Sequence, residues 1–204
     1  MQTLASRFVL PLVAAALTIG PSSDGAAQEA APDGPRYRDG DNLVFPQDYR
    51  SWPFIGGGLG MTYADEGGTP AAAENPTFSH AFVNPSSYRH FVTTGEWPDR
   101  TVFVLEFRAS ASAHSINTDG RFATGLVAIE AEVKDSRFPD GWAYFAFGRD
   151  GEIAPAAAPL GPAAAERCVQ CHVEHGAVER TFVQFYPTLL EIAREKGTLK
   201  PGFE

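Results

Sequence analysis

The strongest pattern in the chain is an alternation of apolar side chains along three segments near its middle. Residues 101–108 carry phenylalanine and leucine on one face and valine on much of the other. Residues 121–134 and 142–147 alternate in the same way, the latter with many aromatic side chains. A period of two predicts strands, and a strand that is apolar on both faces predicts a central position in a sheet.

Shorter elements surround these strands. Residues 42–46 and 49–55 form the first expected ordered segment, and 77–83 predict another strand. Asn84-Pro85 predicts the start of a helix that ends at Gly95, and a second helix is expected over 188–196, with a capping box at its start and Gly197 as its stop. Short connections between successive strands favour antiparallel pairing. We therefore expect an α+β fold dominated by an antiparallel β-sheet with flanking helices.

The two ends of the chain differ from this middle part. Residues 1–27 contain one early arginine, an apolar run and small residues, which is typical of a secretory signal peptide. Residues 28–40 are rich in Ala, Pro, Asp and Gly and predict a disordered lead-in. Residues 41–204 are then one domain, in which an Ala/Pro linker over 154–165 precedes the C-terminal segment.

Charge narrows the range of partners. The chain carries 25 acidic and 16 basic residues, a formal net charge of −9. This balance disfavours nucleic acid and anionic membranes, and favours a basic redox partner or a small neutral substrate. No apolar stretch is long enough to span a bilayer.

The main chemical signal is Cys168-Val169-Gln170-Cys171-His172. In an exported protein, C-x-x-C-H predicts attachment of one c-type haem, with two thioethers to the macrocycle and His172 on the iron. A zinc site would need a fourth protein ligand, and no second ligand pair is present in the sequence. A dithiol redox pair is expected beside a βαβ pattern, which is absent here. The motif predicts a C-terminal haem c attachment segment in the fold.

A sixth iron ligand has few candidates. Met61 lies in a glycine-rich stretch, and His175 is too close to His172 to reach the opposite side of the haem. His90 and His114 are expected at the surface. We therefore expect a haem whose distal side has no protein ligand.

Several segments in order resemble the cytochrome P-460 family, which includes cytochrome c′-β. These segments are 82–88, 94–102, 129–135, 142–145, 168–172 and 180–187. The resemblance covers about residues 41–195, nearly all of the chain after the leader. It implies an antiparallel β-sheet with helices, usually a homodimer, and a five-coordinate haem.

The resemblance also assigns residues to the distal side. Family enzymes that oxidise hydroxylamine bond a lysine to the haem, directly before a glutamate. Here Glu106 matches that glutamate and Leu105 takes the place of the lysine. An aliphatic side chain forms no such bond, so the modified chromophore is expected to be absent. The resemblance assigns a proton-accepting carboxylate to Glu130, and His80 matches a distal arginine. The alternatives are that Glu130 alternates onto a solvated face with Glu132 and Lys134, and that His80 packs in an aromatic core.

These observations predict a periplasmic monohaem cytochrome that binds small nitrogen species such as nitric oxide or hydroxylamine. Loss of the lysine favours binding, whereas Glu130 favours oxidation, so turnover stays open. Its expected partners are the small ligand, a redox partner cytochrome and a second copy of the chain. The alternative is a six-coordinate electron-transfer cytochrome, which needs a second strong axial ligand.

Overall fold

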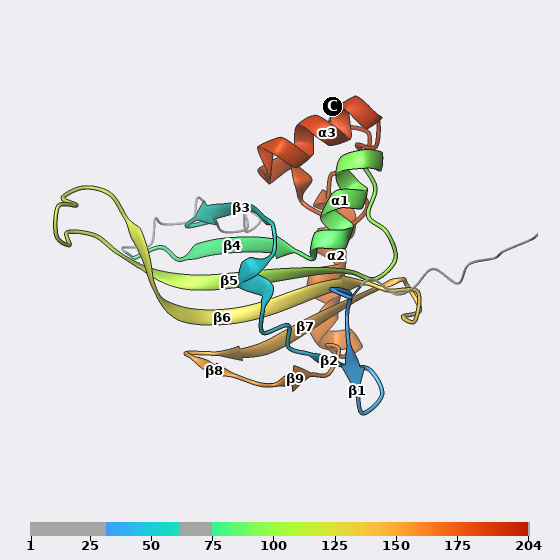
Figure 1. Cartoon of the computed structure of the whole chain (residues 1–204), viewed down its shortest axis with the longest axis horizontal. Coiled ribbons are helices and arrows are strands. Elements are labelled where there is room, and N and C mark those ends of the chain that lie inside the picture. Colours follow the sequence, from blue (N-terminus) through green and yellow to red (C-terminus); the bar gives the residue numbers. More distant parts are fainter. Residues whose placement is uncertain (1–31, 62–74, 204) are drawn as a thin grey trace, which may run out of the picture. The chain divides into compact units, whose positions relative to one another are not determined.

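A six-stranded antiparallel sheet forms the centre of the fold (Figure 1). The computed structural model describes residues 32–61 and 75–203. The strands follow one another in the order β3-β4-β5-β6-β7-β8, and every neighbouring pair is antiparallel. They are β3 Phe54–Leu59, β4 Phe78–Val83, β5 Thr101–Ala111, β6 Phe122–Lys134, β7 Trp142–Arg149 and β8 Glu152–Ile153. The predicted antiparallel, β-dominated fold and the central position of residues 101–108 are confirmed.

A smaller sheet packs on one face of the large one. It contains β1 Tyr37–Arg38, β2 Asn42–Val44 and β9 Ala156–Ala157, in the order β1-β2-β9. The apolar core on this face brings Leu43, and Tyr49 from the short 3-10 helix η1 (Tyr49–Ser51), against one set of alternating side chains of the large sheet. Burial of these side chains stabilises the two sheets against each other.

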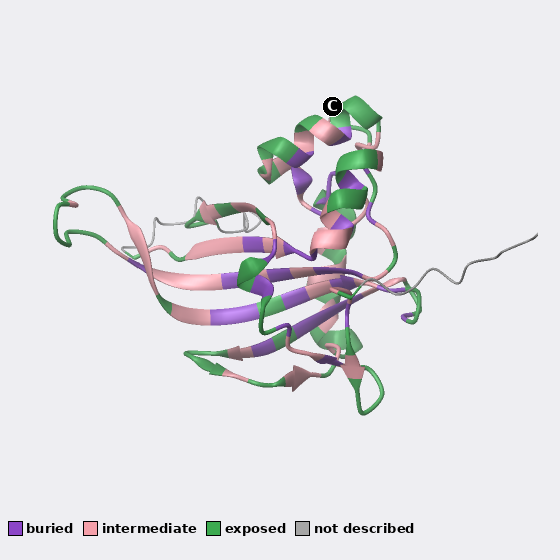
Figure 2. Ribbon diagram, in the orientation of Figure 1, coloured by how far each residue is buried: buried purple, intermediate pink, exposed green. Residues whose placement is uncertain are grey.

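The helices contribute to a second apolar core. They are α1 Pro85–Thr94, α2 Pro162–His175 and α3 Pro187–Lys196, with the 3-10 helix η2 Val183–Phe185 before α3. Phe91 of α1 and Leu189 of α3 pack in this core with Trp97 and with Val83 from β4. The helices α1 and α3 thus cover one end of the second face of the sheet, whereas α2 has no buried residue and Glu130 on that face is exposed. Figure 2 shows buried residues along β5, β6 and β7.

Two helix starts differ from their predicted form. Asn84 does precede α1, but its Oδ1 accepts a hydrogen bond from the Val102 backbone N–H (2.9 Å), and a carboxylate oxygen of Asp33 accepts from the Ser86 N–H in its place (2.8 Å). The helix α3 begins at Pro187, so Thr188 does not serve as the predicted N-cap. A tertiary contact thus replaces the local cap of α1, whereas α3 has no side-chain cap. Gly95 and Gly197 end their helices in the left-handed conformation, as predicted.

Residues 32–40 differ from the predicted disordered lead-in. Tyr37 lies on β1, donates a hydrogen bond from its hydroxyl to Asp135 (2.9 Å) and packs edge-on against Phe138. These contacts anchor a segment whose composition alone offers little to bury. The predicted signal peptide, 1–27, lies outside the described residues. Within the described part of the chain, no helix is long and apolar enough to cross a membrane.

Candidate haem site

The Cys-x-x-Cys-His motif lies on the last turns of α2. A proline at the first helical position and the alanines that follow it favour helix formation there. Cys168 and Cys171 are separated by three positions, so both thiols project from neighbouring points of one helix face. Neither forms a disulfide, and both are partly exposed. His172 follows directly and has far less contact with solvent, at 19% side-chain exposure.

The ring of His172 is held by two aromatic neighbours and two acceptors. Tyr144 and Phe182 pack edge-on against it, with ring centroids 5.0 and 4.6 Å away. The Nδ1 atom lies 2.8 Å from the Arg180 carbonyl oxygen and 3.0 Å from Oε1 of Glu132. Both contacts involve Nδ1, which makes it the protonated nitrogen. The Nε2 atom is therefore the nitrogen available to a metal.

The carbonyl and the carboxylate meet Nδ1 differently. The N–H is aligned with the Arg180 carbonyl, whereas Glu132 Oε1 is buried without an aligned hydrogen-bond donor despite its short distance from the ring. Burial lowers the pKa of His172, but the Glu132 carboxylate and the Arg180 carbonyl outweigh burial and raise it overall.

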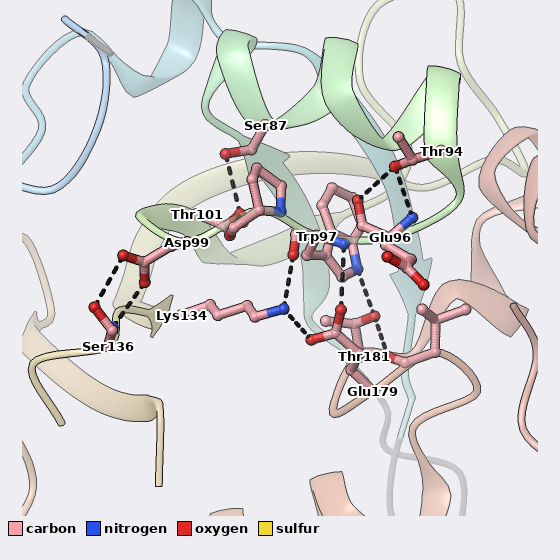
Figure 3. A network of polar contacts seen from close by, with 12 residues as sticks. Ser87, Thr94, Glu96, Trp97, Asp99, Thr101, Lys134, Ser136, Glu179 and Thr181 are labelled. Carbon is pink, nitrogen blue, oxygen red and sulfur yellow. Dashed lines mark hydrogen bonds and ion pairs between the residues drawn. The ribbon is translucent and has the colours of Figure 1, made fainter. Parts of the chain in front are cut away.

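A polar network fixes the loop that supplies this carbonyl (Figure 3). Lys134 of β6 donates to the Trp97 carbonyl (2.7 Å) and pairs with Glu179 (2.6 Å). The Trp97 indole N–H donates to the Thr181 hydroxyl (2.9 Å). Arg180 lies between Glu179 and Thr181, so these contacts hold its carbonyl in position.

Gly176 allows this loop to return close to the end of α2. A Cβ atom on Gly176 would lie 2.7 Å from both the His172 carbonyl oxygen and the Arg180 carbonyl carbon. Backbone atoms at that distance have no flexible way to move aside. A glycine at this position is therefore needed for the close approach of the two segments.

Glu130 lies on β6 two residues before Glu132 and on the same face of the strand, beside a hollow of about 270 Å³. The lining residues are Thr77, Phe107, Val127, Ala128, Glu130 and Arg149. Burial raises the pKa of Glu130, with Arg149 and His172 acting in the opposite direction. The charge of Glu130 also helps to raise the pKa of Cys168, after burial, which is the larger cause. Glu130 is thus within electrostatic reach of the motif.

Leu105 is the cross-strand neighbour of Glu130 in the β5–β6 register. Directly opposed residues point to the same face of a sheet. The structure therefore places Leu105, which stands where the family enzymes have the lysine, beside Glu130, the carboxylate that this chain retains.

His80 lies on the other face of the sheet. It is the cross-strand neighbour of Glu106, while the next pair along, Ala81 with Leu105, points to the Glu130 side. The His80 Nδ1 atom lies 3.7 Å from Glu106 Oε1. The structure does not bring His80 together with Glu130 or His172, because the strand alternation turns it away. Its predicted distal role has no geometric support.

Sequence reasoning did not assign a role to the residues around the His172 ring. These are Glu132, Tyr144, Arg180 and Phe182. The sequence did contain signals that could have identified these residues. Glu132 shares the strand face of Glu130 through the period of two, and the other three residues lie in segments that carry the family resemblance.

The donor set of this site fits a c-type haem. Two thiols one helical turn apart can form two thioethers, and an imidazole with its Nδ1–H already donated presents Nε2. The thiols fit a dithiol redox pair less well, because such a pair uses a cysteine of lowered pKa. Burial instead raises the pKa of Cys168, with Glu130 adding to it, and that of Cys171, with Glu174 adding to it.

Two comparisons with known proteins bear on the site. A family model described as Cytochrome P460 matches residues 46–183, more than half of the chain, including Cys168, Cys171 and His172. The search of curated proteins gave no match.

Proposed function

The chain belongs to the cytochrome P460 family, and from this premise we propose that it is an exported c-type cytochrome that binds small nitrogen species at its haem. Membership in the family implies the haem cofactor. The finer proposal is that Cys168 and Cys171 hold one haem through thioethers and that His172 binds the iron through Nε2.

One observation carries this proposal, namely the orientation of the His172 ring. Its Nδ1 atom is occupied by the Arg180 carbonyl, 2.8 Å away, and Tyr144 packs against the ring. A histidine fixed through Nδ1 beside two thiols on one helix is the arrangement that a covalently attached haem requires.

Leu105 and Phe107 of β5 and Glu130 of β6 support a role in ligand chemistry. When bound, the haem supplies one-electron redox chemistry and a metal position for a small ligand. Phe107 and Leu105 provide an apolar wall that favours neutral ligands over water, which loses hydrogen bonds there. Glu130 can take up a proton that a nitrogen substrate releases on oxidation, because its raised pKa makes it a better base than an ordinary carboxylate.

The direct test uses the purified holoprotein. Mass spectrometry is expected to show one haem mass that survives denaturation, and Cys168→Ser combined with Cys171→Ser should remove it. The ferrous protein should bind nitric oxide, and hydroxylamine oxidation should be measured with an electron acceptor. A protein that takes up no haem when the attachment machinery is present would contradict the proposal.

The electron-carrier alternative requires a sixth ligand, and the described residues offer little support for it. Met61 is 53% exposed, and its sulfur lies over Gly58. His80 faces Glu106, while His90, His114 and His175 are exposed. A low-spin, six-coordinate resting spectrum would favour the electron carrier over the ligand-binding protein.

Export, dimerisation and a redox partner belong to the same proposal. The leader-like pattern of residues 1–27 supports periplasmic location, and the family resemblance supports a homodimer. The net charge of −9 supports a basic partner cytochrome. Mass analysis of the mature N-terminus, sedimentation of the holoprotein, and the salt dependence of its reduction by a basic cytochrome test these three points separately.

A further inference from the structure

Glu132 is placed to act on the nitrogen of His172 that does not face the iron. It comes from β6, its side chain is 11% exposed, and its Oε1 atom lies 3.0 Å from Nδ1. Among the described residues, Glu132 is the carboxylate within ion-pair distance of this ring, whereas Glu130 acts on it only through the electrostatic field.

The contacts of Glu132 differ from those of a structural ion pair. Lys134, two positions along the same face, is paired with Glu179. Oε1 of Glu132 is instead buried without an aligned donor, and so is Nη1 of Arg180 without an aligned acceptor. Glu132 forms no ion pair with Arg180 in the described part of the chain, and its ion-pair partner there is the His172 ring. Its short distance to the imidazole points to a role at His172.

The Nδ1–H has two acceptors of unequal strength. The Arg180 carbonyl is neutral, whereas Glu132 is a carboxylate, and hydrogen bonds to ionised acceptors are roughly twice as strong as neutral ones. A small rotation of the ring would align the N–H with Oε1. An anionic acceptor on Nδ1 raises the electron density of the imidazole and therefore its strength as a ligand through Nε2.

We propose that Glu132 is a positioning residue on the proximal side of the haem, which strengthens His172 as an electron donor and favours the ferric over the ferrous state. This inference rests on the proposed ligation of iron by His172. It adds a residue behind the proposed iron ligand, in a position to which the motif assigns no residue.

The test compares holoprotein variants that remove the same charge at different places. Glu132→Gln removes the anionic acceptor while keeping the side-chain size. The equilibrium for one-electron reduction is expected to shift roughly tenfold toward the ferrous state, a rise of about 59 mV in reduction potential. The iron–histidine stretching band of the ferrous protein should also move to lower frequency in resonance Raman spectra.

Glu174→Gln is the matched control. Glu174 lies two residues after His172 on α2, with a side-chain exposure of 74% and a recorded ion pair to His175 rather than to the His172 ring. Its loss changes the net charge equally, but it should leave the stretching band in place and shift the potential far less. Equal shifts in the two variants with an unmoved band would overturn the inference, because only a general charge effect would remain.

A third variant covers the case in which Glu132→Gln takes up no haem. Glu132→Asp keeps the charge but holds it at a greater distance from Nδ1. Its iron–histidine band should therefore lie at a lower frequency than that of the unmutated protein, and an unmoved band counts against the inference. The proposed function is tested separately in the unmutated protein. If that protein shows no iron–histidine band, the proposed ligation fails; if it shows the band and Glu132 variants do not move it, only the inference fails.

Discussion

Two glutamates on one strand face have different surroundings in this protein. Glu132 contacts the ring of His172, whereas Glu130 lies beside the hollow that includes Phe107 and Arg149. The period of two brings both side chains to the same face, and the spacing along β6 separates their environments. Both carboxylates on this face of β6 therefore lie near the Cys-x-x-Cys-His motif, but each has different neighbours.

Replacing Glu130 tests its role as a proton acceptor. Glu130→Gln is expected to lower hydroxylamine oxidation by 10²–10⁴-fold, the usual contribution of a positioned base, while nitric oxide still binds. The pKa of Glu130 is raised by burial, so turnover should increase with pH above the range of an ordinary carboxyl, as the base loses its proton. The measurement is the rate against pH for both proteins. A variant that keeps the rate and the profile of the unmutated protein would exclude the role.

The position of Leu105 predicts the spectrum of the haem. Leucine lacks a nitrogen to bond to the macrocycle, so the reduced holoprotein should have the absorption of an ordinary c-type haem. Absorption spectroscopy before and after reduction provides the measurement. A strongly red-shifted ferrous band would contradict the prediction, and Leu105→Lys is the variant in which such a band could arise, since Leu105 shares the Glu130 face.

At the scale of elements, the site depends on a helix and a loop that approach each other closely. No residue of α2 belongs to either of the two apolar cores. The loop after it is held by Trp97, Lys134 and Thr181. The position of His172 is thus set by the loop and the sheet more than by the helix.

Gly176→Ala tests this dependence on the loop. The new Cβ would meet backbone atoms of His172, Arg180 and Thr181 at 2.7–2.8 Å. We expect a loss of about 1–3 kcal/mol in the free energy of unfolding, measured by urea denaturation, because overpacking forces the backbone to shift.

The matched control is Gly125→Ala on β6. A Cβ there meets no heavy atom within 4 Å, so the free energy of unfolding should change by less than about 0.5 kcal/mol. Equal stability of the two variants would show that the loop tolerates a side chain at position 176.

The same elements explain what the sequence could reveal. Residues 101–108 and 121–134 were predictable because alternation is a strong local signal, and antiparallel pairing was predictable from the short connections, whereas the order of the strands was not predicted. The helix α2 was not predicted, because the Ala- and Pro-rich composition of residues 154–165, which include its first residues, predicts a linker. Glu132 was likewise missed, since its contact with His172 joins residues 40 positions apart that only the tertiary structure brings together.

At the scale of the whole molecule, Glu106 of β5 joins the large sheet to the 3-10 helix η1 through a buried charge. It accepts hydrogen bonds from Tyr49 of η1 and from Arg50 and Arg108. Its residue exposure is 2%, and His80 lies at its edge. Burial alone would raise the pKa of Glu106, but the bonds from Arg108, Tyr49 and Arg50 lower it to about 2. The ionised form is thus strongly favoured in the folded protein.

Removing this charge should destabilise the whole domain. Glu106→Gln leaves two arginines without their shared acceptor, and we expect a loss of about 2–3 kcal/mol in the free energy of unfolding at pH 7. Because the folded-state pKa lies below the ordinary value, the stabilisation is complete above about pH 5 and is lost as the pH falls toward 2. The difference between variant and unmutated protein should therefore shrink in urea titrations at pH 3.

Glu195→Gln is the control. The side chain of Glu195 is 73% exposed and pairs only with its neighbour Lys196 among the ion pairs of the described residues, so this change should alter stability little at either pH. A Glu106→Gln deficit that stays constant between pH 7 and pH 3 would show that lost packing, and not the buried charge, accounts for the loss of stability.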